Sequence, residues 1–176
     1  MHPSKFTIRK PGAKEHGVIG ALMVEVYSQL EGFPTPAEQP KYYEMLSNVG
    51  SLTENPHIHL LAAYSPEQVL AGCVLYIGDM QYYGSGGTAT QVKDSSGFRL
   101  LAVAPDFRGQ GIGRLLTRYC IERARKEKRQ QLIIHSTKAM QVAWGMYERM
   151  GFERSEDLDF RQGTLEVYGF RLPLDD

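Results

Sequence analysis

Residues 98–128 read F-R-L-L-A-V-A-P-D-F-R-G-Q-G-I-G-R-L-L-T-R-Y-C-I-E-R-A-R-K-E-K, and this stretch gives the clearest indication of the fold. Its first part, Phe98–Val103, is apolar and is predicted to be a strand that ends before a turn marked by Pro105. Its last part is predicted to be a helix, because apolar residues recur with the three-and-four spacing of one buried stripe. The stripe comprises Ile112, Leu115, Leu116, Tyr119, Cys120 and Ala124.

A glycine-rich bend, Arg108-Gly109-Gln110-Gly111-Ile112-Gly113, joins this strand to the helix. The first N–H groups of a helix have no intrahelical acceptor, and the helix dipole is positive there. Glycine allows the backbone to approach a ligand closely, and Arg108 and Arg114 add positive charge. We therefore predict an anion site, most plausibly for phosphate groups. A glycine-rich turn without a ligand is the alternative interpretation.

Two common glycine motifs do not match this bend. A dinucleotide fingerprint G-x-G-x-x-G that starts at Gly109 or Gly111 requires glycine at positions now held by Arg114 and Leu116. A P-loop requires Gly-Lys-Ser/Thr, which occurs nowhere in the chain. The pattern that remains is Arg-x-x-Gly-x-Gly after a strand that reads L-A-V-A-P.

This pattern resembles the acetyl-CoA-binding motif of the GNAT N-acetyltransferase superfamily, usually written Q/R-x-x-G-x-G/A. A second segment, A-W-G-M-Y-E-R-M-G-F at Ala143–Phe152, resembles the A-x-x-x-Y-E-K-x-G-F segment of the same family. The resemblance implies an α/β (α+β) protein of the GNAT fold, formed by residues 1–176 as a single domain. It implies a mixed, mostly antiparallel central sheet of about six to seven strands, flanked by about four helices.

The resemblance also implies site residues. Tyr147 would donate a proton to the departing CoA thiolate, and a backbone N–H near Val103 would stabilise the oxyanion. A core tyrosine bonded to backbone is the alternative role of Tyr147. The implied residues that bind acetyl-CoA are Leu101, Ala102, Val103, Arg108, Gly109, Gln110, Gly111, Ile112, Gly113, Arg114, Thr137 and Ala143.

One position departs from the family pattern. Many relatives carry asparagine one turn before the alanine at 143, where this chain has Met140. That asparagine usually holds the pantetheine or the start of the helix. Ser136 or Thr137 is the expected source of the missing polar group.

A general base is also required, because an amine attacks only when it is neutral. His135 is the first candidate, with a buried structural histidine as the alternative, and Glu31, Glu44 and Asp79 are further candidates. In the family the first two helices and their link form one wall of the acceptor pocket. The candidates for this wall are Phe33, Tyr42, Tyr43 and Glu44, with ordinary packing as the alternative role of each. The glycine-rich stretch Gly78–Gly97, which includes Tyr82 and Tyr83, is expected to be an irregular lid, with strand extensions as the alternative for part of it.

The periodicity of the remaining chain predicts further elements. Strands are expected at residues 5–10, 57–64, 69–77, 131–136, 152–159 and 164–172, with residues 160–163 as the link between the last two. Helices are expected at residues 13–30, 40–48 and 139–150. His57 and His59 share one face of a strand, but no third ligand is spaced to join them, so no metal is expected.

Composition limits the partners. The chain has 20 basic and 20 acidic residues, so no nucleic-acid or membrane partner is expected. The N-terminus has no apolar segment of a signal peptide, so we expect a cytoplasmic protein. Cys73 and Cys120 are expected to be small buried side chains, with a disulfide or a nucleophile as alternatives.

Together these features predict an acetyl-CoA-dependent N-acetyltransferase that uses no metal. Its acceptor would be a primary amine of a small molecule, a peptide or a protein. A non-catalytic acyl-CoA-binding module and a binder of another phosphate ligand are the alternatives. A homodimer would follow the habit of the family.

Overall fold

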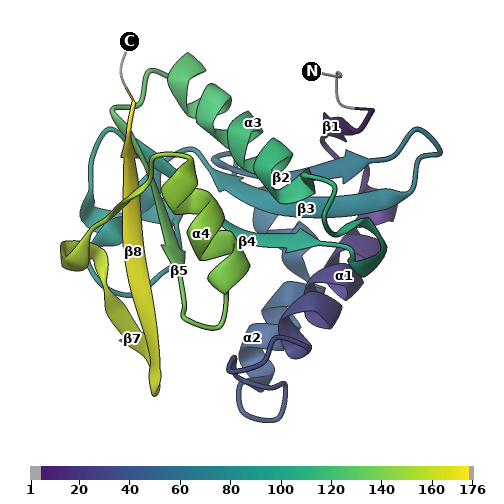
Figure 1. Ribbon diagram of the computed structural model, residues 1–176, viewed down its shortest axis with the longest axis horizontal. Coiled ribbons are helices and arrows are strands. Elements are labelled where there is room, and N and C mark those ends of the chain that lie inside the picture. The colour runs from purple at the N-terminus through teal and green to yellow at the C-terminus, as the bar shows by residue number, and fades with distance from the viewer. Residues whose placement is uncertain (1–4, 175–176) are drawn as a thin grey trace.

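A single mixed sheet forms the centre of the molecule in the computed structural model, which describes residues 5–174 (Figure 1). Its strands are β1 (Thr7–Arg9), β2 (Ile58–Tyr64), β3 (Leu70–Ile77), β4 (Ser95–Val103), β5 (Gln131–Ser136), β6 (Glu153–Arg154), β7 (Phe160–Gln162) and β8 (Leu165–Pro173). Its α-helices are α1 (His16–Ser28), α2 (Pro40–Ser47), α3 (Ile112–Lys126) and α4 (Gln141–Arg149). None of the helices in this part of the chain is long and apolar enough to cross a bilayer.

The strand order is β1-β2-β3-β4-β5-β8-β6, and β7 pairs with β8. Every pair is antiparallel except β4 with β5, which is parallel. The expectation of a mixed, mostly antiparallel sheet with four flanking helices is confirmed. Over the described residues the sheet has eight strands rather than six to seven, because β7 forms within the link expected at residues 160–163, while the strand expected at 152–159 is reduced to β6.

The parallel pair β4–β5 is short. It comprises only Ser95 with Gln131, Ser96 with Leu132 and Gly97 with Ile133. Past Gly97, β4 stays paired with β3 on its other side, while β5 stays paired with β8. An opening therefore develops between the C-terminal parts of β4 and β5. The backbone N–H and C=O groups that face this opening have no strand partner, although both strands stay paired on their other sides.

A bulge lies in β4 where the opening begins. Leu75 of β3 pairs with Arg99 and Cys73 pairs with Ala102, so β4 contains one extra residue between these pairs. Leu100 sits in the bulge with a φ of 62°, a conformation that is rare for a bulky side chain. Such bulges redirect a strand and its side chains, and they are common beside functional sites.

Two apolar cores cover the two faces of the sheet. Side chains of α1 and α2 pack on one face, around Met23 and Leu46, and those of α3 and α4 pack on the other, around Leu116 and Tyr147 (Figure 1). Cys73 belongs to the first core and Cys120 to the second, and both are free thiols. The expected role of both cysteines as small buried side chains is confirmed.

Several boundaries differ from the sequence-based expectation. The helix expected at 13–30 begins as a single 3₁₀ turn, and β4 begins at Ser95, inside the expected loop 78–97. The link expected at 160–163 is largely β7, which forms a hairpin with β8 through Gly163 and Thr164. Tyr119 is 39% exposed, because the buried stripe of α3 follows Ile112, Leu116, Cys120 and Ala124 rather than Tyr119.

Contact between α1 and α2 requires glycine at position 20. A Cβ atom at Gly20 would lie 2.3 Å from the carbonyl oxygen of Ser47, whereas one at Gly17 in the same helix would meet nothing within 4 Å. We expect Gly20→Ala to lower the free energy of unfolding by about 2 kcal/mol, since the helices must move apart. The control Gly17→Ala is expected to raise it by about 0.5–1 kcal/mol. Urea denaturation measures both changes, and equal effects would contradict this packing.

Candidate active site

A cavity of about 840 Å³ lies where β4 and β5 separate. One end is bordered by the glycine bend at the start of α3, and the other by aromatic side chains of α1 and α2. The predicted site residues that line the cavity are Leu101, Val103, Arg108, Gly109, Gly111, Ile112, Gly113, Arg114, His135, Thr137, Ala143 and Tyr147. The structure thus brings together residues that lie up to 46 positions apart in the sequence, from 101 to 147.

Two predicted residues do not line this cavity. Ala102 is buried in the core on the α1–α2 face, where it pairs with Cys73. Gln110 is exposed and borders a separate depression next to Leu115 and Arg118. Their side chains point elsewhere because alternate residues of a strand face opposite sides and because the bend turns outward at Gln110.

The glycine bend presents free donors. Gly109 and Gly111 both have a φ of 80°, a left-handed conformation that favours glycine, and a Cβ at either position would meet nothing within 4 Å. Over the residues that the structure describes, no acceptor pairs with the N–H groups of residues 109–114. Arg108 and Arg114 are exposed, and neither has an ion-pair partner between residues 5 and 174. The bend therefore has the donors and the charge of an anion site.

The edge of β4 offers a second set of backbone groups. The N–H of Ala104 donates to the carbonyl of Ala71, and Val103 lies opposite Gly72 in the same register. Val103 is thus in a non-hydrogen-bonded pair, and its N–H and C=O point away from β3, toward the opening. The carbonyl of Leu101 accepts a hydrogen bond of 3.1 Å from the Tyr27 hydroxyl. An extended ligand can pair with this edge as an added strand.

Tyr147, on α4, also lines the cavity. Its side chain is 5% exposed and packs against the rings of Phe98 and Phe152 at 5.9 and 5.6 Å. Its hydroxyl makes no hydrogen bond to the described residues. The alternative role of a core tyrosine whose hydroxyl is bonded to backbone therefore gains no support. Burial raises the pKa of Tyr147 well above its ordinary value, so the hydroxyl stays protonated at neutral pH.

Ser136 ends β5 and Thr137 follows it, and both line the same cavity as Tyr147. Their hydroxyl oxygens are buried and have no hydrogen-bond partner in the described part of the chain. Buried hydroxyls are almost always paired, so both are available to a bound ligand. Met140 occupies the N-cap of α4 and makes no side-chain cap, which matches the departure seen in the sequence.

His135 is held at both ring nitrogens. Nε2 lies 2.9 Å from the Leu158 carbonyl, and Nδ1 lies 3.0 Å from the Tyr83 hydroxyl. Because a carbonyl can only accept, Nε2 must carry the proton, and Nδ1 accepts from Tyr83. Burial lowers the pKa of His135 and raises that of Tyr83, which keeps the imidazole neutral and the phenol protonated.

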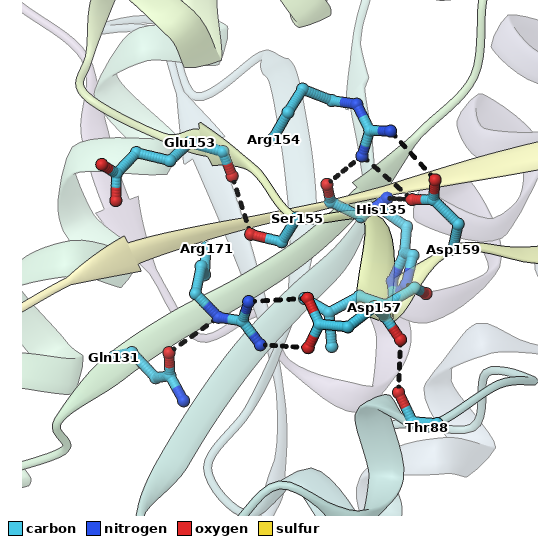
Figure 2. Close-up of polar contacts among 11 residues, drawn as sticks. Thr88, Gln131, His135, Glu153, Arg154, Ser155, Asp157, Asp159 and Arg171 are labelled. Atoms are coloured by element: carbon cyan, nitrogen blue, oxygen red, sulfur yellow. Dashed lines mark hydrogen bonds and ion pairs between the residues drawn. The ribbon is translucent and has the colours of Figure 1, made fainter.

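Two ion pairs hold the Leu158 carbonyl in place (Figure 2). Arg154 pairs with Asp159 and Arg171 pairs with Asp157, each through two bonds of 2.9 Å, on either side of Leu158. The main chain of Asp157 also accepts a bond of 2.7 Å from Thr88. This clamp fixes the orientation of His135, and none of its members has a sequence signal beyond being charged or polar.

The aromatic end of the cavity matches part of the expected acceptor wall. Phe33 and Tyr42 line it together with Tyr27, which was not expected there. Tyr43 instead donates to the Pro34 carbonyl at 2.6 Å, and Glu44 is exposed outside the cavity. Of the candidate bases, Glu31 lines the cavity with His135, whereas neither Glu44 nor Asp79 does.

The expected lid is anchored rather than free-standing. Tyr83 is buried and forms the cavity wall with Ser85, while Tyr82 faces away and stacks on His57 at 5.0 Å. Two positions that line the cavity, Tyr27 and Arg99, were not expected from the sequence, and Tyr83 was expected only as part of the lid. Within residues 5–174, no group of three or more His, Cys, Asp or Glu side chains is placed to hold a metal ion.

Comparisons with known proteins identify the fold. The fold is similar to an acetyltransferase of the GNAT family from Staphylococcus aureus MU50, with a TM-score of 0.74 and 14% identity over 97% of this chain and 99% of that one. It is also similar to the PaiA N-acetyltransferase from Thermoplasma acidophilum in complex with coenzyme A, with a TM-score of 0.69 and 16% identity over 94% and 98% of the two chains.

A chimera of spermidine N-acetyltransferase SpeG from Vibrio cholerae with hSSAT is similar too, with a TM-score of 0.69 and 16% identity over 97% and 96% of the two chains. No curated protein sequence matches the chain. The sequence profile of the acetyltransferase (GNAT) domain matches residues 56–154, which is more than half of the chain. This protein therefore belongs to the GNAT family of acetyltransferases.

Proposed function

We propose that this protein transfers an acetyl group from acetyl-CoA directly to a primary amine of a small molecule, a peptide or a protein. One observation carries the proposal. A single cavity joins the free N–H groups of residues 109–114, the unbonded hydroxyl of Tyr147 and an aromatic pocket. Groups suited to a cofactor, a proton donor and an acceptor thus share one cavity, as group transfer requires.

The residues along the cavity suit coenzyme A. Phosphate groups match the N–H groups of the glycine bend and the guanidinium groups of Arg108 and Arg114. Amide groups of the pantetheine arm match the edge of β4 at Val103 and the orphaned hydroxyls of Ser136 and Thr137. When bound, acetyl-CoA supplies an acetyl group activated as a thioester.

Tyr147 is proposed to be the general acid. Its raised pKa means that the Oη atom carries its proton at neutral pH, and no neighbour competes for that proton. The hydroxyl can therefore donate to the sulfur as the C–S bond breaks.

The pair of Tyr83 and His135 is proposed to accept the proton of the acceptor amine. Neutral His135 offers the Nδ1 lone pair only to the Tyr83 hydroxyl, which itself lines the cavity. A proton that reaches Tyr83 Oη moves on as Tyr83 passes its own proton to Nδ1. Glu31, which is exposed at the cavity, is the second candidate base.

We also propose a cytoplasmic location, one domain over residues 1–176 and, from the habit of the family, a homodimeric assembly. One structural neighbour is a spermidine N-acetyltransferase chimera, so a polyamine is a competing class of acceptor. A non-catalytic acyl-CoA-binding module and a binder of another phosphate ligand are the competing functions, and the following measurements separate them.

Isothermal titration tests the cofactor. We expect acetyl-CoA and CoA to bind and ATP to bind far more weakly. Arg108→Gln and Arg114→Gln should each weaken CoA binding about tenfold, since each removes a charged hydrogen-bond donor. Lys126→Gln, the same charge change at the far end of α3, should have no effect. Tight binding of ATP without binding of CoA would overturn the assignment of the cofactor.

The proton donor is tested by Tyr147→Phe. We expect kcat for acetyl transfer to fall by about 10²–10⁴-fold, because the sulfur must leave without a proton donor. The affinity for acetyl-CoA should change little. Tyr119→Phe on the exposed side of α3 serves as the matched control and should leave kcat unchanged. Unchanged turnover of every accepted amine by Tyr147→Phe would exclude the role.

The state of His135 is tested by long-range ¹H–¹⁵N NMR. A free imidazole is half protonated near pH 6.5, whereas the lowered pKa of His135 should keep it neutral there with the proton on Nε2. Tyr83→Phe should shift the Nδ1 resonance and retain the Nε2–H tautomer. An imidazolium or an Nδ1–H tautomer at pH 6.5 would contradict the arrangement.

A further inference from the structure

We propose that the amine acceptor carries a carboxylate, and that Arg99 binds this carboxylate at the aromatic end of the cavity. The inference rests on the proposed function, because it names the class of acceptor for the same site. It follows from the surroundings of one side chain that neither sequence motif includes.

Arg99 is a cation without a counter-charge. It lies on β4 immediately before the bulge at Leu100, is half-buried and lines the cavity. Its Nη1 donates to the Tyr83 carbonyl at 3.0 Å. None of the carboxylates in the described chain lies within 4 Å of its guanidinium. Most of its N–H donors are therefore free, although half-buried charges are usually paired.

The position of the guanidinium is built into the fold. Gly84 has a φ of 79°, and a Cβ there would lie 2.8 Å from Nη1 of Arg99. Glycine at this position thus leaves room for the guanidinium beside the main chain of residues 83 and 84. The carbonyl of Tyr83 then orients the planar group, and Tyr83 is itself held by His135. A preoriented guanidinium suits a planar carboxylate, which it can bind through two parallel bonds.

The charges around the cavity support an anionic group on the acceptor. Its charged lining side chains are Glu31, Arg99, Arg108, Arg114 and Arg149. Arg108 and Arg114 belong to the glycine bend, which leaves Arg99 as the half-buried charge near the acceptor. Burial raises the pKa of Tyr42 and Tyr83 and lowers that of His135. The positive charge of Arg99 opposes the two upward shifts and adds to the downward one, as expected for a cation close to all three. A polyamine would place a second cation against Arg99.

The walls indicate the body of the acceptor. The rings of Tyr27, Phe33 and Tyr42 pack on one another with centroid distances of 5.5, 5.8 and 6.3 Å. These rings present an aromatic surface beside Arg99. An apolar or aromatic side chain fits such a surface, since it removes apolar area from water. An aromatic amino acid combines the required amine, carboxylate and apolar body.

Three amines with the same ring test the proposal. Phenylalanine carries the carboxylate. Phenylalaninamide has an uncharged amide in place of the carboxylate, and its amine is less basic than that of phenylalanine. Phenethylamine has neither a carboxylate nor an amide, and its amine is more basic than that of phenylalanine. We expect kcat/KM to be about 10- to 100-fold higher for phenylalanine than for either analogue, the range of a charged hydrogen bond. A free-thiol assay measures this. Because the analogues differ in basicity in opposite directions, amine reactivity cannot mimic that order.

Variants assign the preference to Arg99. Arg99→Gln should remove the preference for phenylalanine while turnover of phenethylamine persists, and Arg99→Lys should retain part of it. Lys126→Gln, which makes the same charge change outside the cavity, should keep the full preference. Equal or higher kcat/KM for the two analogues in the unsubstituted enzyme would overturn the carboxylate proposal and leave acetyl transfer standing, and this comparison needs no variant to fold.

A binding measurement tests the carboxylate proposal independently of turnover. In the complex with CoA, N-acetylphenylalanine should bind at least tenfold more tightly than N-acetylphenylalaninamide, and Arg99→Gln should abolish the difference. Equal binding of the two compounds, or binding of neither, would overturn the proposal. Failure of acetyl-CoA to bind would instead refute the proposed function, so the two failures are distinguishable.

Discussion

The separation of β4 from β5 creates the cavity and sets where the residues of the candidate site lie. Only Ser95–Gly97 and Gln131–Ile133 pair, and Gly97 lies at the point where the strands separate. A Cβ at Gly97 would lie 2.6 Å from the carbonyl oxygen of Ile133 and 2.8 Å from the ring of Tyr83. Beyond this contact the bulge at Leu100 turns β4 away. Without the opening, backbone groups at Val103 would pair with β5 and the cavity would close.

The polar groups around this opening fall into two kinds. His135 and the turn at Leu158 are fully satisfied, by Tyr83 on one side and by the two Arg–Asp pairs on the other. These bonds restrain the imidazole, because loss of Tyr83 or of the Leu158 carbonyl would leave a half-buried ring nitrogen unpaired. In contrast, the Thr137 hydroxyl, the N–H groups of the glycine bend and most of the Arg99 donors are unsatisfied by the described chain. The satisfied groups position the side chains around the cavity, and the unsatisfied groups are free to form hydrogen bonds with bound ligands.

Much of the fold was predictable because its signals are local. The strand at Gln131–Ser136 and the helices that became α2, α3 and α4 follow from apolar periodicity, with errors of one or two residues at most ends. The end of the chain was predicted less well, since β6 and β7 are too short to show a period. The hairpin of β7 and β8 had a usable signal, Gly163 followed by Thr164 between two short alternating runs.

The proposed cofactor end of the candidate site could be predicted from local motifs alone. These motifs contain the glycines at 109 and 111, the flanking arginines and Tyr147, and residues that are neighbours within one motif are also close in the fold. Only the tertiary structure decided the acceptor end, because Tyr27, Tyr83, Arg99 and His135 come from separate elements that no local pattern links. It also showed that Arg99 lacks a carboxylate partner in the described residues, a property of three-dimensional surroundings rather than of residue type.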